Sequence, residues 1–66
     1  MSTFTADELA REAQREVRQR QWTYSRLVEE GRMASAIAER RIALMEAIAE
    51  KLQAEAEAAN PQGRLW

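Results

Sequence analysis

The sequence predicts an all-α fold, an antiparallel two-helix hairpin that dimerises into a four-helix bundle. Three observations lead to this prediction. Apolar residues recur at helical spacing along two long segments, a glycine separates these segments, and the only proline lies beyond the second one. We expect a helix over about residues 5–30, a turn at 31–33, a helix over about 34–59 and a tail at 60–66. Residues 1–66 then form a single helical-hairpin domain.

The start of the first predicted helix carries a strong local signal. Thr5 and Glu8 have the spacing of a capping box, in which each side chain accepts a hydrogen bond from the other residue's backbone amide. Phe4 and Leu9 have the spacing of a hydrophobic staple around the same cap. Further along, residues within an arc of roughly 100° form an apolar stripe, namely Leu9, Ala10, Ala13, Val17, Tyr24, Leu27 and Val28.

The second predicted helix follows a short turn. Gly31 tolerates the left-handed conformation that ends many helices, and Ala34 or Ser35 caps the next one, serine being the better cap chemically. Apolar residues then cover an arc of roughly 160°, wider than one partner helix needs. They are Ile37, Ala38, Ile42, Leu44, Met45, Ile48, Ala49 and Leu52. A flatter, alanine-rich side lies next to this arc, and Asn60-Pro61 ends the helix.

A turn this short forces the two helices to lie antiparallel. The expected neighbours are Leu27 with Ile37, Tyr24 with Arg41, Val17 with Ile48, and Ala13 with Leu52. Because one chain of 66 residues buries little apolar surface, we expect a homo-oligomer, a dimer in the first place. The predicted core and oligomer residues are Leu9, Val17, Tyr24, Leu27, Val28, Ile37, Ile42, Leu44, Met45, Ile48 and Leu52.

Composition argues against several classes of protein. The chain has no cysteine and no histidine, which excludes disulfides and any thiolate or imidazole metal site. The same absence removes an imidazole base, and the isolated glycines form no phosphate-binding loop, so we predict no enzyme, no catalytic residue, no metal and no cofactor. No apolar run spans a bilayer and no signal peptide is recognisable, which favours a cytoplasmic protein without a membrane partner.

Trp22 is the most informative side chain for function. It lies about 160° around the helix from Tyr24, opposite the predicted core. Residues 11–26 hold five arginines and two glutamates, a net charge of +3 within a chain of net charge −1. A partner-binding surface is therefore predicted from Trp22, Arg11, Arg15, Arg18 and Arg26. The same side chains suit the backbone of a nucleic acid, and a purely structural alternative packs Trp22 in the dimer interface.

Two further arginines interrupt the apolar arcs. Buried Arg20 and Arg41 each need a carboxylate, a carbonyl or water. Glu16 is placed one turn before Arg20, and Arg41 is expected near the ring of Tyr24. A polar layer that fixes the register of the helices is the simpler interpretation, and an anion-binding pair is the alternative.

The central segment resembles a group of small phage- and prophage-encoded helical proteins. The resemblance rests on the steps Arg18-Gln19-Arg20, Tyr24-x-Arg26-x-Val28 and Gly31-Arg32-Met33, followed by Met45-x-Ala47-Ile48. It covers about half of the chain, and Ser25 and Ala34 depart from the proline and the Ser or Thr that the group often carries. The group has no assigned activity, so the resemblance implies a phage setting in a bacterial host and no catalytic residue.

These observations favour a non-enzymatic accessory protein that binds a host or phage protein as a helical-hairpin oligomer. Two alternatives stay open. One is a nucleic-acid-associated accessory protein that uses the arginines of residues 11–26. The other is a structural protein whose whole function is self-assembly.

Overall fold

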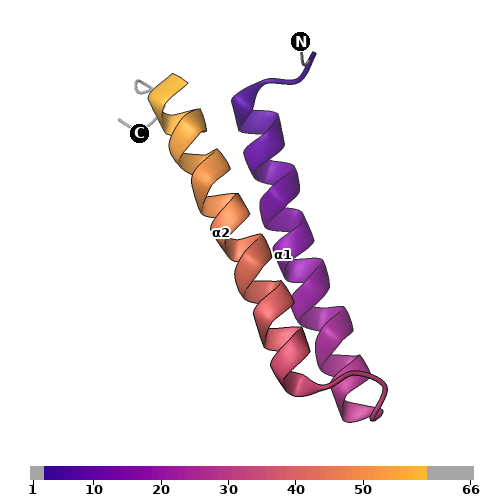
Figure 1. Ribbon diagram of the computed structural model, residues 1–66. Helices are drawn as coiled ribbons and strands as arrows, with labels where there is room; N and C mark the ends of the chain where they lie inside the picture. The colour runs from indigo at the N-terminus through magenta and orange to yellow at the C-terminus, as the bar shows by residue number, and fades with distance from the viewer. Residues whose placement is uncertain (1–2, 60–66) are drawn as a thin grey trace.

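The computed structural model describes residues 3–59, which form two α-helices packed side by side in opposite directions (Figure 1). Helix α1 spans Ala6–Glu29, and helix α2 spans Ser35–Ala59. The predicted all-α, antiparallel hairpin is confirmed. The expected tail at 60–66 lies outside the described residues. Within the described part of the chain, neither helix combines the length and apolarity needed to cross a membrane.

The start of α1 has the predicted capping box. The Thr5 hydroxyl accepts a hydrogen bond from the Glu8 amide at 3.1 Å, and the Thr5 amide donates to the Glu8 carboxylate at 3.0 Å. Asp7 and Glu8 also place negative charge in the first turn, where the helix dipole is positive. Two of the amides that a helix start leaves free are thus satisfied by side chains of the chain itself.

The turn between the helices depends on a glycine. Gly31 has φ of +73°, the left-handed conformation that closes many helices. The Gly31 and Arg32 amides then bond to the carbonyls of Val28 and Leu27, at 3.0 and 2.8 Å. These bonds satisfy carbonyls at the end of α1, as the sequence predicted for Gly31.

Helix α2 begins without a side-chain cap. Its first helical bond runs from the Ala38 amide to the Ala34 carbonyl at 3.1 Å, which makes Ala34 the cap residue. Of the two caps expected from the sequence, the structure therefore selects alanine rather than Ser35. Alanine offers no oxygen to the free amides of the first turn, so the start of α2 is less well stabilised than that of α1.

The two helices meet along a seam whose positions alternate three and four residues apart, as in a coiled coil. On α1 these positions are Ala10, Ala13, Val17, Arg20, Tyr24 and Leu27, and on α2 they are Ala38, Ile42, Met45, Ala49, Leu52 and Ala56. All the fully buried residues in the described range are alanines, namely Ala10, Ala13, Ala38, Ala49 and Ala56. The seam is therefore built from small residues, with the larger side chains only partly covered.

The seam differs in one respect from the expected pairs. Ile37 and Ile48 were assigned to the contact with Leu27 and Val17, but the residues that follow them, Ala38 and Ala49, are the buried ones. Both isoleucines are about half exposed. The physical reason is the width of the apolar arc on α2, which one partner helix cannot cover, so that α1 contacts only one edge of it.

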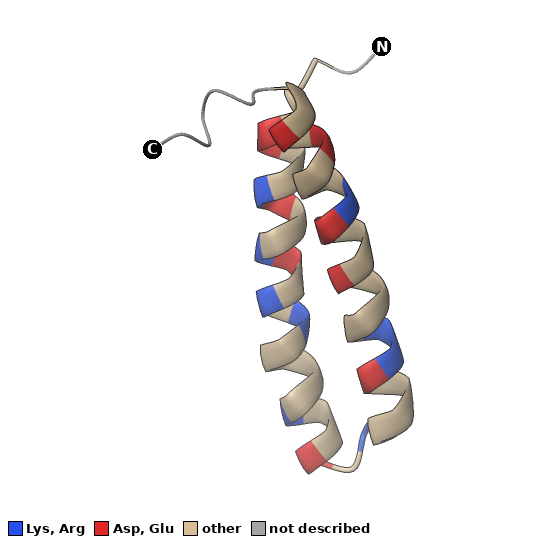
Figure 2. Cartoon of the chain, turned by 90° about the vertical axis from the view of Figure 1, so that its left-hand side faces the viewer, with Lys and Arg blue, Asp and Glu red and all other residues tan. Residues whose placement is uncertain are grey.

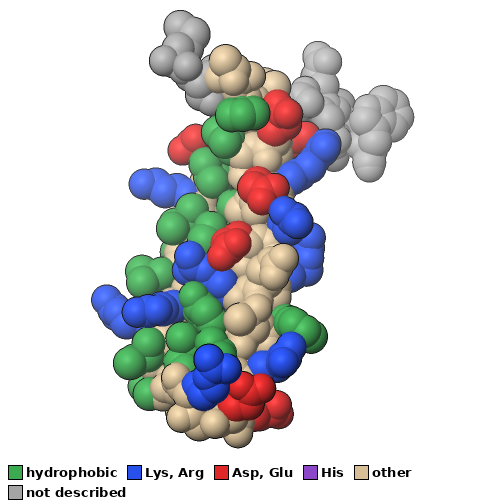
Figure 3. All heavy atoms as spheres, turned by 90° about the vertical axis from the view of Figure 1, so that its right-hand side faces the viewer, with side chains coloured by type: hydrophobic (Ala, Val, Ile, Leu, Met, Phe, Trp, Pro, Cys, Tyr) green, Lys and Arg blue, Asp and Glu red, His purple; other side chains and the backbone are tan. Residues whose placement is uncertain are grey.

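The other predicted core and oligomer residues fall into two groups. Val17, Tyr24, Leu27, Val28, Ile42, Met45 and Leu52 are partly buried in the hairpin. Leu9, Ile37, Leu44 and Ile48 are exposed. In Figure 3 the hydrophobic side chains form a column along the α2 side, interrupted by basic side chains. The single chain thus leaves much of the apolar surface of α2 in contact with solvent.

Candidate functional site

The outer face of α1 displays a tryptophan that the hairpin does not use. Trp22 is 64% exposed. Tyr24, two residues on, is partly buried in the seam, so the indole lies on the opposite side of the helix. Because no other element of residues 3–59 packs on this side of α1, the exposed indole is available for contact with another molecule.

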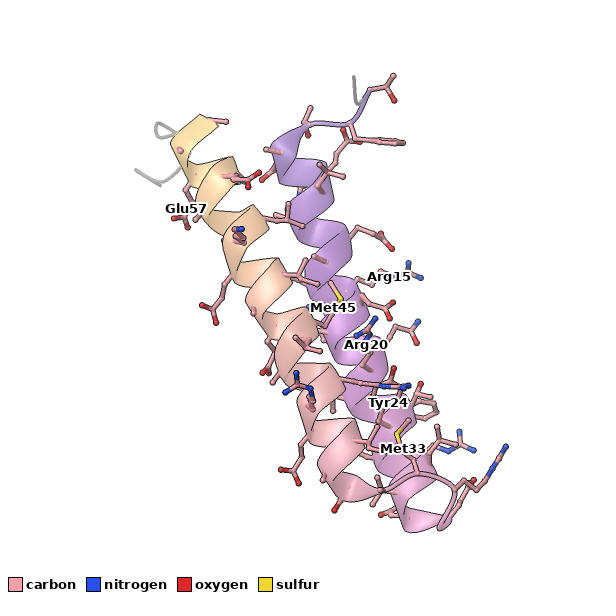
Figure 4. All side chains as sticks on the ribbon, in the orientation of Figure 1. Arg15, Arg20, Tyr24, Met33, Met45 and Glu57 are labelled. Atoms are coloured by element: carbon pink, nitrogen blue, oxygen red, sulfur yellow. The ribbon has the colours of Figure 1, made fainter. Side chains whose placement is uncertain are left out.

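Four arginines share this face with Trp22, and we name the set Arg11, Arg15, Arg18, Trp22 and Arg26 the Trp22 face. Their positions fall within an arc of about 80° at 100° per residue. Figure 2 shows the basic residues of α1 as a column along its outer edge, and in Figure 4 Arg15 points away from α2. The sequence-predicted partner-binding residues therefore lie together on one strip of the helix.

Two arginines of the Trp22 face are tied to acidic neighbours on α1. Arg11 pairs with Asp7 at 2.6 Å, and Arg15 pairs with Glu12 at 3.2 Å. All four side chains are well exposed, so these pairs contribute little to stability. They do lower the positive electrostatic potential of the Trp22 face, because the carboxylates of Asp7 and Glu12 neutralise part of its charge.

Arg26 and Arg18 have different surroundings. The Arg26 guanidinium carbon lies 5.0 Å from the centre of the Trp22 ring, within the range of a cation–π contact. A carboxylate oxygen of Glu30 is 3.9 Å from the same guanidinium. Arg18 forms no ion pair within residues 3–59 and lies one turn before the indole. The strip thus combines a planar aromatic surface, a stacked cation and an unpaired cation.

A polar layer crosses the seam at mid-height. The Arg20 guanidinium donates to Glu16 at 3.0 Å and to the backbone carbonyl of Arg41 at 3.1 Å. Its side chain is 29% exposed, and Figure 4 draws it near Met45 at mid-height of the hairpin. The prediction that Arg20 needs a carboxylate or a carbonyl is confirmed, since it has both. The bridge links the helices at one defined position, as a register-fixing layer would.

The cation–π contact considered for Arg41 with Tyr24 is not formed within the described residues. Within residues 3–59 the cation–π contact is that of Arg26 with Trp22, and Arg41 takes part in the polar layer through its carbonyl alone. The Arg41 side chain is exposed. The reason is again the edge of α2 that α1 covers, which leaves Arg41 beside the seam rather than in it.

A shallow polar groove along one edge of the hairpin was not expected from the sequence. Gln14 donates to Gln53 at 2.9 Å and Gln21 donates to Glu46 at 3.4 Å, both across the seam. Arg18 and Glu50 also line this groove. Glutamines have no helical pattern of their own that would distinguish a cross-helix bond from a solvated side chain, so only the packing of the helices reveals the pairing.

The described residues include no group of three histidine, cysteine, aspartate or glutamate side chains placed to hold a metal ion. Comparison of the chain with protein-family models, with curated proteins and with solved structures found no match. The resemblance to small phage-encoded proteins consequently stays a prediction, and the function is argued from the surfaces of the hairpin.

Proposed function

We propose that this protein is a non-enzymatic accessory protein that binds a protein partner through the Trp22 face and works as a dimer of hairpins. The observation that carries the proposal is the exposure of Trp22 on the side of α1 away from α2. Tryptophan and arginine are the residue types most enriched among residues that dominate binding energy at protein interfaces. A phage setting in a bacterial host follows from the resemblance and belongs to the same proposal.

The arrangement of the strip suits a protein surface. The indole offers a large, flat apolar area at the centre, and the Arg26 guanidinium lies over its ring. The arginines on either side can form charge-assisted hydrogen bonds with carboxylates or carbonyls of a partner. Binding through a centre of apolar contact and a polar rim is the usual organisation of protein interfaces.

Nucleic acid is the second candidate, favoured by the net charge of +3 over residues 11–26. Phosphates would have to compete with the carboxylates of Asp7 and Glu12, which already hold Arg11 and Arg15. The chain as a whole is acidic, with a net charge of −1. Both facts weaken the long-range attraction on which nucleic-acid binding depends, so the protein partner is preferred.

The test is a pull-down from bacterial host lysate, with and without nuclease. Wild type is compared with Trp22→Ala and with the matched control Thr23→Ala, an exposed neighbour that lies off the Trp22 face. We expect a discrete protein that survives nuclease, is retained by Thr23→Ala and is lost with Trp22→Ala. Circular dichroism of all three proteins verifies that the hairpin is intact.

Other outcomes identify the alternatives. Recovery that disappears with nuclease, together with binding of an oligonucleotide that weakens steeply with salt, would favour the nucleic-acid function. Equal recovery by wild type and Trp22→Ala would remove the Trp22 face as the binding site. If the pull-down recovers no protein and no nucleic acid, self-assembly would be the function best supported.

A further inference from the structure

Charged side chains are unevenly distributed along the outer side of α1. Its two ends are acidic, with the carboxylates of Asp7, Glu8, Glu12, Glu29 and Glu30. Between residues 12 and 29 this side carries three arginines of the Trp22 face and no carboxylate, since Glu16 lies toward the seam and bonds within the polar layer. The fourth arginine, Arg11, is paired with Asp7. The basic section therefore runs from Arg15 to Arg26, a distance of about 17 Å at 1.5 Å per residue.

Two of these arginines lie on either side of Trp22. Arg18 is four residues before it and Arg26 four residues after it, so each is about 6 Å away along the helix axis. The Arg26 guanidinium lies over the indole at 5.0 Å, which leaves the N–H groups at its edge for a planar carboxylate. Arg18 forms no ion pair within residues 3–59, not even with Glu50, which lines the same groove. An apolar centre thus has one cation a turn before it and another a turn after it.

A hollow of about 250 Å³ lies beside the indole and can receive an apolar side chain. Trp22 and Leu27 give its lining an apolar part, and Arg26 and Glu30 give it a charged part. The Glu30 carboxylate is 3.9 Å from the Arg26 guanidinium, and both side chains are about half exposed, so this ion pair is weak. A carboxylate of a partner can therefore replace Glu30 at Arg26.

We propose that the partner of the Trp22 face is an acidic helix, in which one carboxylate lies a turn before and another a turn after a large apolar side chain. The inference rests on the proposed protein-binding function and specifies the chemistry of the partner. In a helix laid along α1, acidic residues at i−4 and i+4 lie about 6 Å from the apolar residue. Arg18 and Arg26 have the same spacing from Trp22. The apolar side chain enters the hollow, and each carboxylate accepts charge-assisted hydrogen bonds from one arginine.

Nucleic acid matches this charge distribution less well. Each strand of duplex DNA carries a phosphate about every 3.4 Å, so its negative charge continues beyond any short segment. Such a polyanion laid along α1 would extend past the basic section and meet the carboxylates at both ends of the helix, among them Glu8 and Glu29. A partner helix with two carboxylates beside an apolar side chain avoids this repulsion. The short length of the basic section therefore selects an acidic protein segment.

Peptide binding tests the chemistry of the partner directly. The Trp66→Phe protein has Trp22 as its single tryptophan, and the indole N–H resonance of Trp22 is followed by NMR. The protein is titrated with two alanine-based, helix-stabilised peptides, one with the pattern Glu-x-x-x-Leu-x-x-x-Glu and one with glutamine in place of both glutamates. We expect the glutamate peptide to shift the resonance saturably and to bind about ten-fold more tightly than the glutamine peptide. Equal affinities, or no shift with the glutamate peptide, would overturn the acidic partner. So would tighter binding of a single-stranded oligonucleotide at an ionic strength of about 0.15 M.

Three single variants locate the charges in the same titration. Arg18→Gln should weaken binding of the glutamate peptide roughly three-fold or more, because one carboxylate loses its cation. Glu30→Gln should strengthen binding roughly two-fold, because Arg26 loses a competing carboxylate. Arg40→Gln removes the same charge as Arg18→Gln from an exposed position on α2 and should leave the affinity unchanged. Circular dichroism verifies that each hairpin is intact. Equal binding by Arg18→Gln and wild type would overturn the assigned contact.

The lysate pull-down separates this inference from the proposed function. The expected result is a protein that is lost with Trp22→Ala and with Arg18→Gln and retained by Arg40→Gln. A protein that is lost with Trp22→Ala but retained equally by Arg18→Gln and wild type would overturn the acidic helix and leave the protein-binding function in place. Equal recovery with Trp22→Ala would overturn both, because the Trp22 face would not be the binding site.

Discussion

Helices α1 and α2 are nearly equal in length, 24 and 25 residues, but their side chains are distributed differently. α1 has one apolar stripe, which α2 covers, and a charged outer face. α2 is apolar over more than half of its circumference and carries nine alanines. One neighbouring helix can bury a single apolar stripe, whereas a helix that is apolar on two sides needs two neighbours to bury both. The difference supports the proposal that α2 carries the self-association and that α1 is left for other contacts.

The largest expected effect comes from placing a charge on the second apolar side of α2. Ile48→Asp should lower the free energy of unfolding by about 3 kcal/mol in the dimer, because apolar burial is lost and a carboxylate is placed in the interface. The melting temperature should also become more dependent on protein concentration. Gln19→Asp on the outer side of α1 should change stability by about 0.5 kcal/mol or less. Urea unfolding at several concentrations measures both, and equal small effects would contradict the contrast between the helices.

A smaller effect concerns the layer that joins the helices. Arg20→Ala removes the bonds to Glu16 and to the Arg41 carbonyl, which we expect to cost about 1.5 kcal/mol. Arg41→Ala should change stability by about 0.5 kcal/mol or less, because only the backbone of that residue takes part in the layer. Thermal unfolding of the two variants tests this. A larger loss for Arg41→Ala than for Arg20→Ala would show that the Arg41 side chain has a structural contact of its own.

The third prediction compares the two helix starts. Ala34→Ser should raise the stability by about 0.5–1 kcal/mol, since a hydroxyl would accept a bond from an uncapped amide of α2. Thr5→Ala should lower the stability by a similar amount, because it removes the hydroxyl of the capping box. Chemical unfolding at one protein concentration measures the two changes. No gain from Ala34→Ser would mean that another group already satisfies the first turn of α2.

How far the sequence predicted the molecule depends on the range of the interactions. Capping and turn chemistry act over three to four residues, so Thr5, Glu8 and Gly31 were sufficient to predict where α1 starts and ends. The position of Trp22 away from the seam follows from helical period alone.

Contacts between the helices were predicted less well. The apolar arc of α2 is wide enough for several rotations of the helix, and alanine contributes little to choosing among them. The choice of Ala38 and Ala49 over Ile37 and Ile48 depends on how closely the two backbones approach, which periodicity does not specify. For the same reason, the Arg41 side chain was expected to be buried and is exposed.

The smallest expected effect follows from the capping box and appears as a dependence on pH. Bonds from the Thr5 backbone amide and hydroxyl, helped by the nearby Arg11, hold the pKa of Glu8 below its usual 4.5. Because the folded pKa is lower than the unfolded one, ionised Glu8 stabilises the protein above pH 4.5, and this contribution disappears as the pH falls through the folded pKa. Glu8→Gln should therefore be less stable than wild type at pH 7, with the difference vanishing in acid. Urea unfolding across this range measures it, and Glu12→Gln, a carboxylate bonded to Arg15 rather than to the backbone, is the control. A difference that persists unchanged in acid would mean that shape, and not charge, is what Glu8 contributes to the cap.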